Sequence, residues 1–150
     1  MRETESFVKE RGFLNEILKV LPHRRPFLLV DRICERQSGL WVRGYKNLSW
    51  SDWFFDQESE KPAMPFMLAV ESIAQLSAFL DEEPRGDLGF LASFKFVYFR
   101  HHAFPGDRLD LFFEAVKRKG AFLIGKGEAR VGGKTVIEAE QMSIYLSTAN

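Results

Sequence analysis

The sequence lacks the features of an exported or nucleic-acid-binding protein. It contains a single cysteine, Cys34, so no disulfide can form within the chain. Its 21 basic residues equal its 21 acidic residues, and a formal net charge of zero gives no overall field that would attract nucleic acid or an anionic membrane. Its first residues are charged and contain no apolar core of a secretory signal. We therefore expect a cytoplasmic protein without nucleic-acid partners.

Motifs for metals and cofactors are also missing. The three histidines are His23 and the adjacent pair His101 and His102. Adjacent side chains on a strand point to opposite faces, so the pair does not predict a compact metal site. His23 precedes the first predicted strand, where a histidine most often makes structural hydrogen bonds. No glycine-rich phosphate loop and no nucleophile elbow is present, and we expect neither a metal nor a cofactor.

Aromatic residues, by contrast, are abundant. The chain has 15 phenylalanines and three tryptophans in 150 residues. Such a content suits a deep apolar pocket, a large subunit interface or an ordinary core, and the sequence does not distinguish between them. The length and the 45% of apolar residues predict a single domain over residues 1–150, with residues 1–12 as an N-terminal extension.

Residues 62–80 predict one long buried helix around which the chain is organised. Pro65 suits a first helical turn, where its missing N–H has no partner in any case. From Met67 to Leu80, apolar residues fall on almost every side of the helix, as expected where other groups surround it. About 20 apolar residues cross a bilayer, but Glu71 and Gln75 at the centre are costly in lipid. The surroundings should therefore be protein.

Glu71 is the principal candidate for a catalytic acid or base. It lies four residues before Gln75, so both side chains share one helix face. A carboxyl group enclosed by apolar side chains needs hydrogen-bond partners or a proton, and such groups are common in active sites. The alternative is an acid that bonds the backbone or a partner subunit.

The rest of the chain predicts a short helix and about six strands. The helix is predicted over residues 13–21, and the strands over residues 27–33, 40–48, 89–99, 109–117, 121–131 and 134–146. Residues 49–61 and 81–87 are predicted loops, and the consecutive glycines Gly132 and Gly133 suit a tight hairpin turn. This order predicts an α+β fold in which an antiparallel sheet curls around one long helix.

Residues 21–33, Leu-Pro-His-Arg-Arg-Pro-Phe-Leu-Leu-Val-Asp-Arg-Ile, resemble the opening signature of the bacterial 3-hydroxyacyl-acyl carrier protein dehydratases of fatty-acid synthesis. Further matches are Lys46-Asn47, Phe54-Phe55, Met64-Pro65, residues 71–75 and residues 99–107. The resemblance implies the hotdog fold, in which an antiparallel sheet of about six strands wraps one central helix. It also implies that two subunits pair to share two active sites, as a homodimer or a higher oligomer of dimers.

The resemblance implies a mechanism as well. In that family a loop histidine and a helix acid, from different subunits, remove water from a 3-hydroxyacyl thioester, because one group must take the α-proton and another must protonate the departing hydroxyl. Glu71 matches the helix acid. The backbone N–H of Phe66, at the positive end of the helix dipole, matches the donor to the thioester oxygen. The substrate-binding residues implied by the resemblance are Met64, Pro65, Phe66, Gln75 and Phe55.

Two positions depart from the family pattern. Where the family has Gly-His-Phe-Pro-Gly, residues 56–61 read Asp-Gln-Glu-Ser-Glu-Lys, one residue shorter and without the catalytic histidine. Glu58 is the nearest substitute for that base, and the alternative is an exposed loop charge. Phe66 stands where the family has a glycine, which keeps the N–H but adds a ring where the thioester approaches.

Three functions therefore stay open. The first is a dehydratase-like enzyme that acts on or binds a 3-hydroxyacyl thioester of acyl carrier protein or coenzyme A. The second is an acyl thioesterase, which uses a helix carboxylate such as Glu71 with water and does not need the missing histidine. The third is a non-catalytic partner that forms a heterodimer with an active dehydratase. The basic residues that suit an acidic carrier protein, or equally a solvated surface, are Arg24, Arg25, Lys95 and Arg100.

Overall fold

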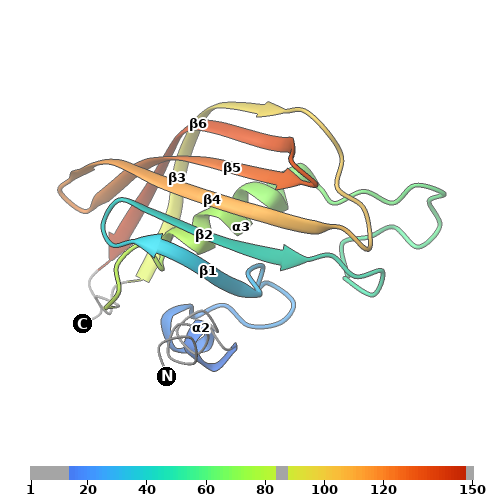
Figure 1. Cartoon of the computed structure of the whole chain (residues 1–150), viewed down its shortest axis with the longest axis horizontal. Coiled ribbons are helices and arrows are strands. Elements are labelled where there is room, and N and C mark those ends of the chain that lie inside the picture. Colours follow the sequence, from blue (N-terminus) through green and yellow to red (C-terminus); the bar gives the residue numbers. More distant parts are fainter. Residues whose placement is uncertain (1–13, 84–87, 148–150) are drawn as a thin grey trace, which may run out of the picture.

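A computed structural model describes residues 14–83 and 88–147 (Figure 1). The elements in chain order are α2 (Leu14–Val20), β1 (Arg32–Gln37), β2 (Trp41–Asn47), α3 (Phe66–Ser77), β3 (Leu88–Phe99), β4 (Arg108–Lys119), β5 (Phe122–Val131) and β6 (Lys134–Ser147). The predicted extension over residues 1–12 lies outside the described residues, as does the end of the predicted loop at residues 84–87.

The six strands form one antiparallel sheet in the order β1-β2-β4-β5-β6-β3. Figure 1 shows the sheet curling around α3, which contacts strands β2 to β6. Leu109, Leu111 and Phe113 alternate along β4 and are all buried, as expected for the inner face of a sheet. The predicted α+β architecture, a six-stranded antiparallel sheet around one helix, is confirmed.

Helix α3 begins directly after Pro65 and ends at Ser77, three residues earlier than predicted. The next three residues continue it as a tighter turn, in which the N–H groups of Ala78, Phe79 and Leu80 donate to carbonyls three residues back. The sheet can approach α3 closely because β5 carries glycine there: a Cβ atom at Gly127 would lie 2.5 Å from Ile73 Cγ2. No helix within residues 14–83 and 88–147 is long and apolar enough to cross a membrane.

The first predicted strand, over residues 27–33, is wrong for most of its length. The strand β1 starts only at Arg32, and its residues are largely exposed. Residues 22–31, here called the strap, precede it without helix or strand. Leu29 and Val30 of the strap are buried. They pack on the core without belonging to the sheet.

Candidate active site

Gln75 holds the strap on helix α3. Its Oε1 accepts a hydrogen bond from the backbone N–H of Leu29 at 2.8 Å, and its Nε2 donates to the carbonyl of Phe27 at 2.7 Å. The side chain is 3% exposed, and a buried amide requires such partners. The amide of Gln75 thus takes the place of a neighbouring strand for this part of the strap.

The far end of the strap is tied to β2 and to the loop over residues 49–61. Asp31 accepts from the backbone N–H of Asn47 at 2.7 Å and lies 3.3 Å from the ammonium of Lys46. The indole N–H of Trp53 donates to the carbonyl of Pro26 at 2.8 Å. These bonds fix the strap at Pro26, near its middle, and at Asp31, its last residue before β1.

Arg24 fixes the start of the strap against α2. Its guanidinium donates to the carbonyl of Leu21 at 2.8 Å and to that of Leu18 at 3.1 Å. Carbonyls at a helix C-terminus lack partners within the helix, and a basic side chain satisfies them favourably. The charge of Arg24 is therefore used within the chain.

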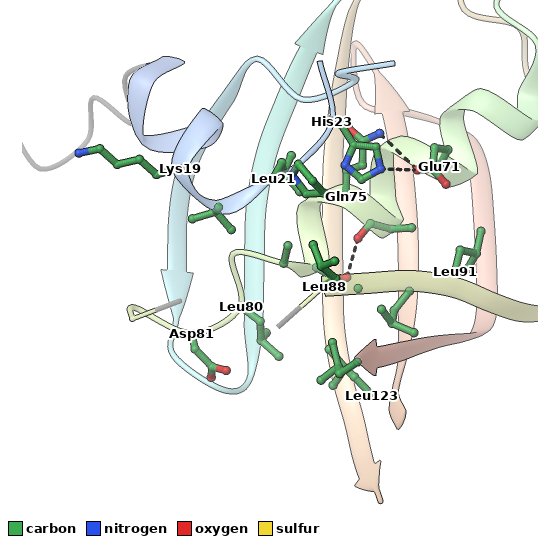
Figure 2. A pocket seen from close by; sticks show the side chains of 18 of the residues that line it. Lys19, Leu21, His23, Glu71, Gln75, Leu80, Asp81, Leu88, Leu91 and Leu123 are labelled. Carbon is green, nitrogen blue, oxygen red and sulfur yellow. Dashed lines mark hydrogen bonds and ion pairs between the residues drawn. The ribbon is translucent and has the colours of Figure 1, made fainter. Parts of the chain in front are cut away.

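The strap places His23 beside Glu71 (Figure 2). His23 Nε2 lies 3.5 Å from Glu71 Oε1, a distance that suits an ion pair when the imidazole is protonated. Gln75 Nε2 donates to the same carboxylate oxygen at 3.2 Å. The other imidazole nitrogen, Nδ1, is buried and has no hydrogen-bond partner among the residues that the structure describes. The carboxylate of Glu71 is thus in contact with His23 of the strap and with Gln75 of α3.

Glu71 is less enclosed than predicted, because 33% of its side chain is exposed. Its helix face opens on a cavity of about 360 Å³. In Figure 2, His23 and Glu71 lie at one end of this cavity and Leu123 lies toward the other. Apolar wall residues are Leu21, Leu80, Leu88, Leu91, Leu123, Ile144 and Leu146. An acid and an imidazole at the end of an apolar cavity can act on the polar head of a ligand with an aliphatic tail.

The structure brings Gln75 to the candidate site with Glu71, and does not bring Glu58 there. Glu58 is exposed, and its backbone N–H bonds to Asp56 Oδ1 at 3.0 Å within the 49–61 loop. No contact joins Glu58 to Glu71 within the described part of the chain. A role for Glu58 at this carboxylate would require a second subunit.

The other predicted substrate-binding residues do not line the cavity. Phe55 and Met64 are 3% and 4% exposed and belong to the core. Pro65 is exposed at the start of α3. Phe66 is 48% exposed, and its ring centroid lies 5.4 Å from that of Phe99. These residues surround the helix N-terminus instead, and their contact with substrate stays a prediction.

The remaining polar groups of the helix serve its own backbone. Ser72 Oγ donates to the carbonyl of Leu68 at 2.9 Å, and Ser77 Oγ donates to that of Ala74 at 2.6 Å, so neither hydroxyl is set up as a nucleophile. No group of three or more His, Cys, Asp and Glu side chains in residues 14–83 and 88–147 could hold a metal ion.

For His23, the sequence favours a structural role over a functional one. His23 lies in the motif of residues 21–33, but the motif does not show which side chain the imidazole contacts. Its neighbour Glu71 is far away in the sequence, and tertiary hydrogen bonds of the strap, including those of Gln75, bring the two together.

Known proteins resemble this chain in sequence and in fold. Residues 21–140 match the FabA-like domain. The 3-hydroxyacyl-[acyl-carrier-protein] dehydratase FabZ of Clostridium botulinum (strain Eklund 17B / Type B) is 45% identical over 133 residues, which cover 85% of this chain and 94% of that protein. FabZ of Clostridium beijerinckii is 46% identical over 133 residues, with the same coverage of 85% and 94%.

Solved structures agree in fold. The dehydratase heterocomplex ApeI:P from Xenorhabdus doucetiae has a TM-score of 0.73 at 20% identity, over 88% of this chain and 91% of that one. A hot-dog-like protein from Thermanaerovibrio acidaminovorans has a TM-score of 0.59 at 16% identity, over 76% of this chain and 85% of that one. At such identities the likeness establishes the fold, which is the hotdog fold.

Proposed function

The chain belongs to the family of FabA-like domains, and on this premise we propose that it is a hydro-lyase that dehydrates a 3-hydroxyacyl thioester of acyl carrier protein in cytoplasmic fatty-acid metabolism. The observation that carries the proposal is the carboxylate of Glu71 at the end of an apolar cavity of about 360 Å³. The FabZ relatives, at 45% and 46% identity, are named for the same reaction on the same class of substrate.

The reaction needs two proton transfers, and Glu71 is proposed to perform one of them. A base removes the α-proton, the electrons of that C–H bond form the double bond, and the C–O bond breaks as an acid protonates the departing hydroxyl. The N–H of Phe66, in the first turn of α3, has no partner within the helix and is proposed to hold the thioester oxygen. Phe66 precedes Glu71 by five residues, or about 7.5 Å along the helix axis.

We extend the proposal to a homodimer formed through strand β3. This strand pairs with β6 on one side, and no described strand pairs with its other side. Unpaired strand edges are natural sites for association. The large side chains exposed on β3 include Phe90, Phe94, Phe96 and Tyr98. Light scattering should give twice the chain mass of 17.4 kDa, and a monomer at micromolar concentration would contradict this part of the proposal.

In such a dimer, residues of one subunit can complete the site of the other. The loop over residues 49–61, with Glu58, and the residues around the helix N-terminus, Phe55, Met64 and Pro65, are proposed to act there. The N–H of Met64 donates to the carbonyl of Ala103 at 2.8 Å, which fixes the backbone just before α3.

A non-catalytic partner of an active dehydratase is the second candidate, because two features favour it. No histidine occurs between residues 24 and 100, so the 49–61 loop brings no imidazole to the site. The ring of Phe66 also stands half-exposed at the helix start, where a thioester would have to approach. The structural neighbour ApeI:P is itself described as a dehydratase heterocomplex, which is compatible with this candidate.

Incubating the purified protein with a 3-hydroxyacyl-acyl carrier protein separates these functions. Mass spectrometry of the acyl group should show the loss of one water, which identifies the enoyl thioester. Release of the free thiol of the carrier would indicate a thioesterase instead. Binding without either product would contradict the hydro-lyase and favour the non-catalytic partner.

A further inference from the structure

His23 is the titratable side chain that lies next to the carboxylate of Glu71. The other charged residues around the cavity are Lys19, Arg24, Asp81, Glu83 and Arg118. Arg24 donates to the carbonyls of α2, and Arg118 lies 3.0 Å from Asp81. In Figure 2, Lys19 and Asp81 both lie away from Glu71. Within the described part of the chain, the carboxylate therefore has one imidazole and one amide at its Oε1, and only the imidazole can carry a proton.

We propose that His23 is the second proton-transfer group of this site and supplies the function for which the 49–61 loop has no histidine. The inference rests on the proposed hydro-lyase function. His23 and Glu71 both line the cavity, and Nε2 and Oε1 are 3.5 Å apart, so a small adjustment brings them within hydrogen-bonding distance. Because Nδ1 is buried, proton exchange by His23 runs through Nε2.

The contacts of Glu71 indicate how the two roles divide. Gln75 donates an N–H to its carboxylate, and a protonated His23 would form an ion pair at the same oxygen, so the proposal gives Glu71 the role of the base and His23 that of the acid. Glu71 takes the α-proton, and the electron pair of the C–H bond first moves onto the thioester oxygen as an enolate and then forms the double bond. The C–O bond breaks, its electron pair stays on oxygen, and His23 Nε2 gives the proton that completes the water.

The short distance between Glu71 and His23 also allows both groups to return to their starting protonation states after each turnover. The reaction leaves a protonated Glu71 beside a neutral His23, with an enoyl thioester and one water as products. Transfer of the proton from Glu71 to His23 Nε2 across the 3.5 Å gap restores the starting ion pair. No oxidant, reductant or further reactant is needed.

The test compares His23→Gln with His101→Gln. In His23→Gln the introduced amide can still donate to Glu71 but cannot transfer a proton, so the variant separates proton transfer from hydrogen bonding. His101 is a matched control because its Nδ1 pairs with the carbonyl of Thr135 at 2.9 Å, outside the cavity. We expect His23→Gln to lower kcat for enoyl formation by about 10² to 10⁴-fold, with KM nearly unchanged, and His101→Gln to match the wild type.

Deuterium exchange distinguishes a proton-transfer role of His23 from a structural role, because only a proton-transfer role predicts that α-proton exchange survives while enoyl formation is lost. In D₂O, His23→Gln should still incorporate deuterium at the α-carbon of recovered substrate, because Glu71 retains its role, although enoyl formation fails. Added imidazole should restore part of the rate to His23→Ala. A His23→Gln variant with wild-type kcat, or a folded His23→Ala without recovery, would overturn the inference alone. A wild type and His101→Gln control that both bind thioester without forming enoyl product would overturn the proposed function itself.

Discussion

The position of His23 beside Glu71 depends on the amide of Gln75, and removing that amide should loosen the strap. Gln75→Met keeps the length of the side chain but leaves the N–H of Leu29 and the carbonyl of Phe27 without their partner. A buried group left unsatisfied costs about 1–3 kcal/mol. Leu29 is 1% exposed and should incur the full cost, whereas water can partly replace the partner at Phe27, which is 53% exposed. We expect a loss of about 2–4 kcal/mol in the free energy of unfolding.

Urea unfolding followed by tryptophan fluorescence measures this loss as a lower midpoint at constant slope. Both proteins must be compared at one concentration, because association would add to the apparent stability. Gln57→Met is the matched control, since Gln57 is exposed and its Nε2 donates to the carbonyl of Trp50 at 3.1 Å. Its effect should stay within about 0.5 kcal/mol. If Gln75→Met cost no more than this control, the strap would not be held by Gln75.

Three further changes test the fold and the surroundings of the site. Gly127→Ala places a Cβ 2.5 Å from Ile73 Cγ2 and should destabilise the fold by about 1–3 kcal/mol; an unchanged melting temperature would show that α3 does not lie so close to β5. Arg24→Met should cost about 1 kcal/mol in urea unfolding and Arg25→Met much less, whereas equal effects would argue against the cap on α2. Cys34 is exposed, but partial desolvation by its surroundings raises the pKa of its thiol, so less thiolate is present at a given pH. Alkylation by iodoacetamide should therefore be slower than for a free cysteine and accelerate as the pH rises; equal rates would contradict this.

Local patterns in the sequence predict most of the helices, strands and turns, because these elements depend mainly on neighbouring residues. The pair Gly132 and Gly133 predicts a hairpin turn, and both residues have positive φ angles, of 56° and 82°. The strands β4, β5 and β6 follow the predicted ranges within about two residues, the usual uncertainty of strand ends. Helix α3 is predicted because apolar residues without glycine or proline extend beyond Pro65.

The strap shows where such patterns fail. Leu29 and Val30 have the apolar sequence typical of a buried strand. The backbone N–H of Leu29, however, donates to the side chain of Gln75 rather than to a neighbouring strand. The real edge strand β1 is polar and largely exposed, so it lacks the alternation that predicts a strand. Glu71 and Gln75 could be placed on one helix face from their spacing, but the approach of His23 depends on tertiary hydrogen bonds that no local spacing records.

The central claim is that Glu71 transfers a proton during dehydration of a 3-hydroxyacyl thioester. The most direct measurement is the rate of enoyl formation by wild type, Glu71→Gln and Glu140→Gln, since Glu140 is an exposed acid on β6 that does not line the cavity. Wild type and Glu140→Gln should form the enoyl thioester at similar rates, and Glu71→Gln should be slower by about 10² to 10⁴-fold. Equal rates for Glu71→Gln and wild type would contradict the claim.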